Sequence, residues 1–176
     1  MSPEELETHN RVKAEIGAVI RNVNVADDLG MLFVDGTLQT NKAAKLSTEP
    51  DAAFVTWHSF MNRRVRQVPR AGHPGQFMEL QGSPDWVLEI ISEYTVQKDT
   101  RDLRAKYHQA GVAEYWLIDA RGEKIDFQLL IRGKKRYTAA TQRRGWLRSQ
   151  VFGRRFRLDR KQHPLGPWIY TLHVKS

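Results

Sequence analysis

The sequence contains no cysteine, no long apolar run and no phosphate-binding loop, and each absence removes a class of protein. Without cysteine there are no disulfides, no thiolate metal sites and no cysteine nucleophile, which fits a cytoplasmic protein. No apolar run reaches the ~18 residues needed to span a bilayer, so we expect no membrane span. The opening MSPEELETHN lacks the basic and apolar stretches of a secretory signal. The GxxxxGKS/T pattern of P-loop enzymes is also missing.

The composition that remains is that of a globular protein. The chain has 176 residues, of which 40% are hydrophobic and 27% are charged. This length is enough to bury a sizeable core, and we see no internal repeat, low-complexity segment or long linker. We therefore expect residues 1–176 to form one domain.

Charge is divided unevenly along the chain. Residues 1–99 carry 10 Lys and Arg against 14 Asp and Glu, whereas residues 100–176 carry 18 against 6. The acidic half could hold a divalent cation, and the basic half could hold a polyanion such as DNA. Many soluble proteins are basic without such a role, so the charge division does not by itself assign a function.

The first element is predicted to be a helix over about residues 3–23. SPEE at its start is a capping-box pattern with proline at the first helical position. Apolar residues then fall on one face at helical spacing: Val12, Ile16, Val19, Ile20 and Val23. His9 projects to the middle of this face and Glu15 to its border. A histidine there is more often a hydrogen-bonded core residue than part of an active site.

Short β-strand signals follow. They cover residues 31–34, 52–57, 64–68, 76–80, 86–92, 114–119 and 124–131, with a helix predicted at 100–110. Residues 64–68 and 76–80 suit a hairpin, and the segment WVLEIIS (86–92) is apolar enough to be a central strand. WVLEIIS, the helix and EYWLID form a strand–helix–strand unit that should give a parallel pair. The order predicts an α/β fold with a mixed central β-sheet flanked by helices.

A lone carboxylate, Glu89, stands inside the most apolar strand. A carboxylate buried there is costly to ionise unless it is paired, hydrogen-bonded or bound to a metal. Asp85 is four residues earlier, roughly 13 Å away along an extended strand, so the two cannot hold one ion together. Asp51, after Pro50 at the start of another strand, is the best partner, and such a pair suits Mg²⁺. Pairing of Glu89 with a buried Lys or Arg is equally compatible with the spacing.

Residues 83–127, SPDWVLEIISEYTVQKDTRDLRAKYHQAGVAEYWLIDARGEKIDF, resemble the signature region of the Uma-two family of restriction-endonuclease-like proteins. This family belongs to the PD-(D/E)XK nuclease superfamily. THNRVKAEI resembles its first helix, GTLQTNKAAKLSTEPDAAFVTW the segment with its first Pro-Asp, and VFGRRFRL with LGPWIYTLHV the end of one branch. The resemblance implies a restriction-endonuclease-like fold and a metal-dependent endonuclease.

The resemblance also implies site residues. Asp51 and Glu89, with the backbone carbonyl of Ile90, would hold Mg²⁺ or Mn²⁺, and Glu15 resembles an acid that some superfamily members add. The motif lysine is displaced, because Ile91 and Leu103 stand where the superfamily and the family place it. Lys98 is the best remaining candidate for the catalytic lysine, with Lys106 behind it. For any isolated lysine, a solvated side chain is the commoner case.

Residues 132–161 hold 12 Lys and Arg against one acid, interleaved with aromatic residues. That mixture suits phosphate contacts and base stacking, although an arginine-rich solvated sheet face would give the same pattern. The candidate nucleic-acid-binding residues are Lys134, Lys135, Arg136, Arg143, Arg144, Arg154 and Arg155.

The functional hypothesis is Mg²⁺- or Mn²⁺-assisted hydrolysis of DNA phosphodiesters, with Lys98 placing the attacking water. Two alternatives remain: a degenerate member that binds nucleic acid without cutting it, and a protein-interaction domain of the same fold. A homodimer is left open.

Overall fold

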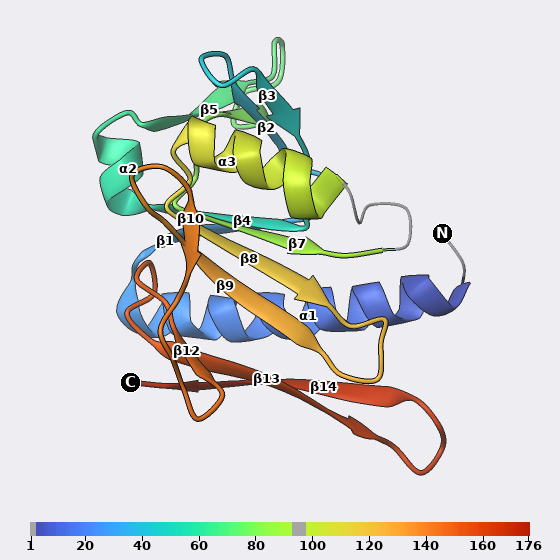
Figure 1. Cartoon of the computed structure of the whole chain (residues 1–176). Coiled ribbons are helices and arrows are strands. Elements are labelled where there is room, and N and C mark those ends of the chain that lie inside the picture. The colour runs from blue at the N-terminus through green and yellow to red at the C-terminus, as the bar shows by residue number, and fades with distance from the viewer. Residues whose placement is uncertain (1–2, 93–97) are drawn as a thin grey trace.

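A mixed six-stranded sheet forms the centre of the computed structural model, which describes the backbone of residues 3–92 and 98–176 and the side chains of residues 7–92 and 101–176. Its strands lie in the order β1-β4-β7-β8-β9-β10, with bounds Gly30–Val34, Ala52–Thr56, Trp86–Ile90, Glu114–Asp119, Asp126–Arg132 and Tyr137–Ala139. Figure 1 shows helix α1 (Pro3–Asp27) on one face and helix α3 (Arg104–Ala110) on the other. The predicted α/β class with a mixed, helix-flanked sheet is confirmed.

Helix α1 is four residues longer than predicted. Its buried stripe of Val12, Ile16 and Ile20 faces the central sheet, as the apolar spacing indicated. The helix continues to Asp27 because Asn24, in its last turn, accepts hydrogen bonds from the N–H groups of Leu29 and Gly30 at 3.1 and 2.9 Å. Among the described helices, α1 included, none is long and apolar enough to cross a membrane.

Strands β7 and β8 form the parallel pair that the strand–helix–strand pattern predicted. Their register runs from Trp86 opposite Glu114 to Ile90 opposite Ile118. The connection returns through a π-helical segment, η1 (Lys98–Leu103), followed by α3. Gly111 ends α3 in the left-handed conformation, with φ 88°, as expected of a glycine at this position. The predicted helix at 100–110 is therefore present, but it is π-helical up to Leu103 and α-helical only from Arg104.

A second sheet covers the α3 side of the molecule. Its strands lie in the order β3-β2-β6-β5, with bounds Leu46–Thr48, Leu38–Asn41, Phe77–Gly82 and Val65–Pro69. The hairpin of β5 and β6 was predicted, whereas β2 and β3 were not. The predicted strand 52–57 ends at Thr56, because the Thr56 side chain accepts a hydrogen bond from Ser59 N and so begins helix α2 (Trp57–Met61).

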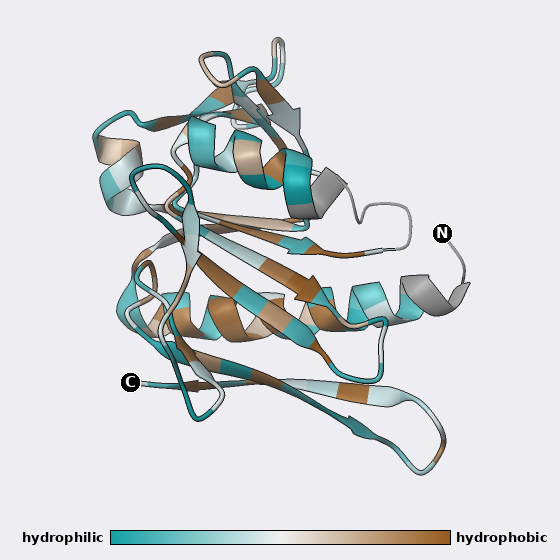
Figure 2. Cartoon of the chain, viewed as in Figure 1, coloured by the Kyte–Doolittle hydropathy of each residue, from teal (hydrophilic) through white to brown (hydrophobic). Residues whose placement is uncertain are grey.

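The C-terminal residues form a third sheet, in the order β11-β12-β13-β14, with bounds Gln142–Arg143, Trp146–Arg148, Arg155–Gln162 and Trp168–Lys175. Figure 1 shows α1 lying between the central sheet and the β13–β14 hairpin. Apolar residues colour both the central strands and α1 in Figure 2, and one buried cluster joins α1, the central sheet and β12–β14. The first and last elements thus share one core.

Candidate active site

Asp51 lies at the entrance to β4, where its carboxylate is held by backbone and side chains together. Its Oδ2 accepts a hydrogen bond of 2.7 Å from the N–H of Ile90, the last residue of β7. Its Oδ1 lies 2.9 Å from Lys13 Nζ and 3.1 Å from His9 Nε2, both on α1. The Asp51 side chain is 13% exposed, so these contacts are partly shielded from water.

Glu89 lies beside Asp51 on the neighbouring strand. Strands β4 and β7 are antiparallel with Ala52 opposite Leu88, so continuing this register places Asp51 opposite Glu89. Opposite residues of an antiparallel pair have Cβ atoms about 5 Å apart. Glu89 is buried, and its Oε1 accepts a hydrogen bond of 2.6 Å from the hydroxyl of Tyr107 on α3. The structure thus brings together the two carboxylates predicted from the sequence.

The two acids are held from opposite faces of the central sheet. Helix α1 supplies His9 and Lys13 to Asp51, whereas α3 supplies Tyr107 to Glu89. Figure 1 shows these helices on the two sides of β4 and β7. The pair therefore sits at the ends of two inner strands of the sheet, with groups from both layers converging on the end of β7.

The charges near Asp51 set its protonation. Burial alone would raise the pKa of Asp51, but the contacts from His9, Ile90 N–H and Lys13 bring that pKa below its ordinary value. Burial works to lower the pKa of Lys13, yet Asp51 and Asp35 outweigh it and hold that pKa above its ordinary value. At neutral pH the pair is therefore a carboxylate and an ammonium ion.

Lys13 was not among the predicted site residues. Its Nζ also lies 3.4 Å from Asp35 Oδ1, and its side chain is only 13% exposed. The available signal was its place one helical turn after His9, since residues four apart share a helix face. His9 contacts the same Asp51 oxygen as Lys13, and its role in an active site stays a prediction.

The other two lysine candidates are Lys98 and Lys106. Lys98 begins η1, but its side chain lies outside the described part of the structure. Lys106 is exposed on α3, next to Tyr107. Ile91 and Leu103, which stand where a motif lysine would be, are buried in one apolar cluster with Tyr107. These positions serve packing in this chain.

Two other acids have structural partners of their own. Asp85 accepts hydrogen bonds from Thr56 N at 2.8 Å and Ser59 Oγ at 2.9 Å, and it pairs with Arg64. It thereby ties α2 to the start of β7. Glu15 Oε1 accepts a hydrogen bond of 2.8 Å from Leu172 N, so its carboxylate meets β14 rather than Asp51.

The donors near Asp51 suit a hard cation that keeps several waters. In the described part of the chain, no three His, Asp or Glu side chains gather closely enough to hold a metal ion by themselves. Asp51, Glu89 and the Ile90 carbonyl would provide three oxygen ligands. The N–H of Ile90 points to Asp51, and in an extended strand the carbonyl of the same residue points to the same side. Mg²⁺ usually takes one or two carboxylates and fills its octahedron with water, so the set fits.

A cavity of about 840 Å³ opens at this end of the molecule. Its lining includes His9 and residues 90–92, which lie at and just after the end of β7. Residues 120–123 and part of β14 also line it. Its arginines are engaged: Arg121 pairs with Asp119, and Arg160 donates to the Ala120 carbonyl at 2.9 Å. Through Ile90, the cavity reaches the end of β7.

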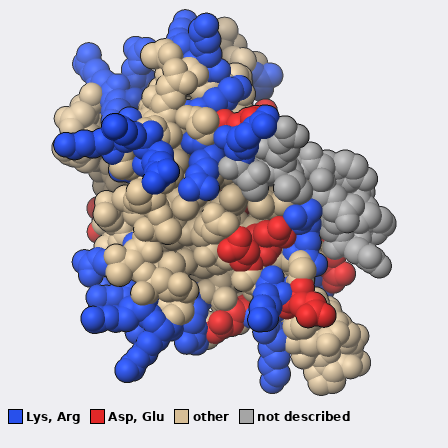
Figure 3. All heavy atoms as spheres, in the orientation of Figure 1, with Lys and Arg blue, Asp and Glu red and all other residues tan. Residues whose placement is uncertain are grey.

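The predicted basic residues fall into separate places. Lys135 and Arg136 line a cavity of about 360 Å³ with Arg101 and Arg104. Arg143, Arg144 and Arg155 line another of about 890 Å³ on the C-terminal sheet, and Arg154 pairs with Asp27 on α1. In Figure 3, Lys and Arg gather over the upper and lower-left parts of the face shown, and Asp and Glu lie toward its right side.

Comparisons with known proteins agree with this fold. A crystal structure described as a putative nuclease belonging to DUF820, from Anabaena variabilis, matches with a TM-score of 0.57 and 19% identity. The match covers 82% of this chain and 73% of that one. No curated protein matches the sequence. The Uma2 family, described as "putative restriction endonuclease", matches residues 1–159, which is most of the chain. The chain therefore belongs to the Uma2 family and has a restriction-endonuclease-like fold.

Proposed function

We propose that this protein is a Mg²⁺- or Mn²⁺-dependent endonuclease that hydrolyses DNA phosphodiester bonds. The observation that carries the proposal is the placement of Asp51 opposite Glu89 on adjacent strands, with the Ile90 N–H bound to Asp51. Family membership supports a nuclease in general. The metal, the reaction and the choice of DNA are our proposals.

Asp51, Glu89 and the Ile90 carbonyl would be the protein ligands. A divalent cation held there would polarise a phosphoryl oxygen and lower the pKa of a bound water. The Ile90 N–H fixes one oxygen of Asp51, and Tyr107 fixes one oxygen of Glu89. An ionised carboxylate has about four lone-pair sites, so it can accept a hydrogen bond and bind a metal ion at the same time.

Lys13 is the lysine that the geometry favours for catalysis. Its ammonium group is held at Asp51 with little exposure to water. From there it can offset the negative charge that builds on the phosphate during attack. Lys98 remains our second candidate for placing the water, because its position follows the strand that carries Glu89. His9, beside Lys13, orients Asp51.

A non-cleaving domain that binds nucleic acid is the second candidate function. Two observations favour it: Ile91 and Leu103 are buried apolar residues at the motif positions of a lysine, and Asp51 already has two basic partners. In such a domain the Asp51–Lys13 pair would be purely structural. A protein-interaction role without nucleic acid predicts no salt-dependent DNA affinity.

A cleavage assay separates these functions. Supercoiled plasmid and oligonucleotides are incubated with wild type, Asp51→Ala, Glu89→Ala and Lys98→Ala in Mg²⁺, Mn²⁺ or EDTA. We expect metal-dependent cutting by wild type that both carboxylate variants lose. Activity that survives both carboxylate substitutions would rule out this site, and a wild type that binds DNA but never cuts it would establish the second candidate.

That residues 1–176 form one domain also remains a proposal. It is supported by the buried cluster in which Ile16 of α1, Trp86 of β7 and Leu172 of β14 all take part.

A further inference from the structure

A basic groove lies on the C-terminal sheet, away from the carboxylates. It has a volume of about 890 Å³ and is lined by Arg143, Arg144, Trp146, Arg155, Arg157, Lys175 and Ser176. We call it the Trp146 groove. Five of these seven residues are cationic and none is acidic. Such a concentration of one charge repels itself and therefore favours binding of a polyanion.

The fold holds these cations in place. Arg144 and Gly145 both have positive φ, 52° and 79°, at the turn between β11 and β12. This tight turn presents Arg143 and Arg144 at its tip, where both are exposed. Within the described residues, neither has an acidic partner in a salt bridge, and Lys175 has none either.

Trp146 contacts two of the groove cations, Arg157 and Lys175, without neutralising them. The Arg157 guanidinium lies 5.1 Å from the centre of its ring, and Lys175 Nζ lies 4.1 Å from the same point. Cation–π contacts of this kind hold a charged group against the ring and leave its charge available. Arg157 is also paired with Asp159, and Arg155 donates to the Ser176 carbonyl at 2.6 Å. The groove therefore keeps a strong positive balance.

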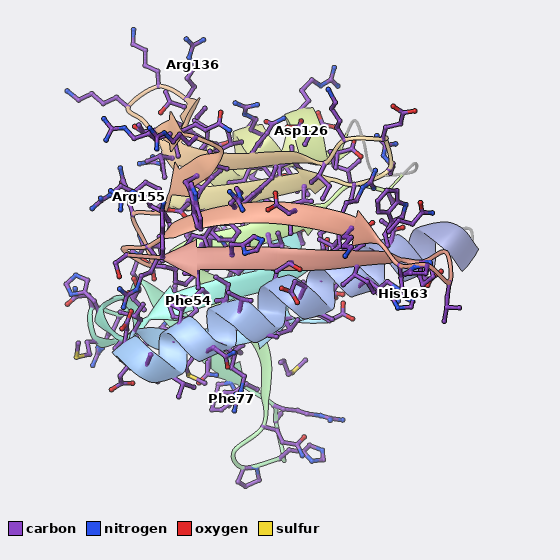
Figure 4. All side chains as sticks on the ribbon, turned by 90° about the horizontal axis from the view of Figure 1, so that it is seen from below. Phe54, Phe77, Asp126, Arg136, Arg155 and His163 are labelled. Carbon is purple, nitrogen blue, oxygen red and sulfur yellow. The ribbon has the colours of Figure 1, made fainter. Side chains whose placement is uncertain are left out.

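The groove and the carboxylate site lie at opposite ends of the molecule. Arg155 begins β13, and Arg160, five residues on, lines the cavity beside Ile90. Five residues of an extended strand span about 17 Å. Figure 4 shows Arg155 at one end of the β13–β14 hairpin and His163 at the other, with Arg136 and Asp126 separated in the same way. Asp126 lies opposite Asp119 in the register of β8 and β9, and Ile118, the residue before Asp119, lies opposite Ile90 at the end of β7.

We propose that the Trp146 groove is a second nucleic-acid-binding site, which holds the phosphodiester backbone of a strand independently of the metal and of base sequence. Arginine forks match phosphate oxygens, and cations on alternate strand residues, such as Arg155 and Arg157, suit a run of successive phosphates. A strand bound here would need about five stacked nucleotides to reach the carboxylate end, at ~3.4 Å each. In the proposed nuclease the groove would anchor substrate beyond the cut.

The test is a binding experiment in EDTA, where no metal-dependent cutting occurs. A fluorescein-labelled oligothymidine of about 20 nucleotides is titrated with protein at several salt concentrations, and anisotropy gives Kd. The variant Arg143→Ala/Arg144→Ala/Lys175→Ala removes three exposed groove cations. The matched control, Arg21→Ala/Arg70→Ala/Lys124→Ala, removes three exposed cations that do not line the groove.

We expect the groove variant to bind at least about tenfold more weakly than wild type and to lower the slope of log K against log salt by about 2. The control should change the affinity less than about threefold. Equal weakening of both variants, or no weakening of the groove variant, would overturn the proposal. Circular dichroism and thermal unfolding verify that both variants fold.

A competition experiment identifies the ligand class. Unlabelled oligothymidine should displace the probe, whereas vesicles of anionic phospholipid at the same phosphate concentration should not. Displacement by vesicles alone would assign the groove to a membrane surface and overturn the proposal. Because binding is read without metal, failure here leaves the cleavage proposal intact, and absence of cleavage leaves this result intact.

Discussion

Lys13 Nζ and Asp51 Oδ1 lie 2.9 Å apart. This contact joins helix α1 to the residue that precedes β4, and both side chains are only 13% exposed. In the proposed function, Lys13 from α1 would take the role of the motif lysine, whose positions are occupied by Ile91 and Leu103 in this chain. The proposed catalytic role can therefore be tested by substituting Lys13, Lys98 and Lys106 one at a time.

Replacing Lys13 by Met should lower the Mn²⁺-dependent cleavage rate by about 100-fold or more, because it removes the charge that, in the proposed mechanism, offsets the charge on the reacting phosphate. Lys13→Arg should retain part of the activity. Lys98→Met and Lys106→Met are measured beside it under single-turnover conditions. A Lys13→Met enzyme that cuts at the wild-type rate, with Lys98→Met inactive, would transfer the role to Lys98.

Tyr107 is expected to position Glu89. Burial, followed by the charge of Glu89, raises the pKa of Tyr107 well above its ordinary value, so its hydroxyl remains a donor throughout the working pH range. Tyr107→Phe should lower the free energy of unfolding by about 1–3 kcal/mol, because a hydrogen bond to a buried carboxylate is lost. It should also raise the Mn²⁺ concentration needed for half-maximal cleavage several-fold.

Tyr137→Phe is the matched control for Tyr107→Phe. The Tyr137 hydroxyl is buried and donates to the Val112 carbonyl at 2.7 Å, with no part in holding Glu89. It should lose stability to a similar extent and keep the wild-type metal requirement. A shared change in metal requirement would mean that Tyr107 acts only through stability.

Asp85 distinguishes the two Pro-Asp pairs of the chain. Because it binds Thr56 N, Ser59 and Arg64, Asp85→Ala should destabilise the protein by about 1–3 kcal/mol. At a temperature where it is folded, its metal-dependent cleavage should stay near wild type, whereas Asp51→Ala should be inactive. The opposite ranking of the two variants would make Asp85 the acid of the site.

Glu114 predicts a pH dependence of stability. It is fully buried on β8, with Trp116 Nε1 at 2.6 Å and Gln150 N at 2.8 Å as donors. Burial raises its pKa above the ordinary value, although these hydrogen bonds oppose the rise. A raised carboxyl pKa means that the contribution of Glu114 to stability is full below pH ~4.5 and declines as pH rises through the folded pKa.

Denaturant unfolding of wild type and Glu114→Gln between about pH 4 and pH 8 measures this effect. The stability of wild type relative to the variant should fall as pH rises and then level off. A relative stability that increases with pH would show that the hydrogen bonds outweigh burial and that the folded pKa is lowered.

The elements that a local pattern specifies were predictable. The apolar stripe of α1, the continuous apolar run of β7 and the glycine at the end of α3 each act within a few residues, and the structure confirms these elements. Strand β2 was not predictable, because it pairs in parallel with β6, about 40 residues away, and only tertiary packing makes a strand of LQTN.

The candidate site, like the fold, was predictable only in part. A buried Glu89 needs a partner and Asp85 lies too far along the same strand, so Asp51 was the best candidate, although a buried Lys or Arg fitted the spacing equally well. That Asp51 and Glu89 together bind a metal stays a prediction. Lys13 did not, because an isolated lysine on a helix is usually solvated. The sequence did not predict the separation of the C-terminal arginines either, because it depends on the course of one long strand, β13, which carries Arg155 and Arg160 to different cavities.

The central claim, that Asp51 and Glu89 hold a divalent cation at the end of β7, is tested most directly by calorimetric titration of Mn²⁺ into wild type, Asp51→Ala, Glu89→Ala and Asp85→Ala. The account predicts that wild type and Asp85→Ala bind Mn²⁺ alike, and that each of the other two variants binds it at least about tenfold more weakly, since each loses a carboxylate ligand. Mn²⁺ binding that is unchanged in both Asp51→Ala and Glu89→Ala would contradict it.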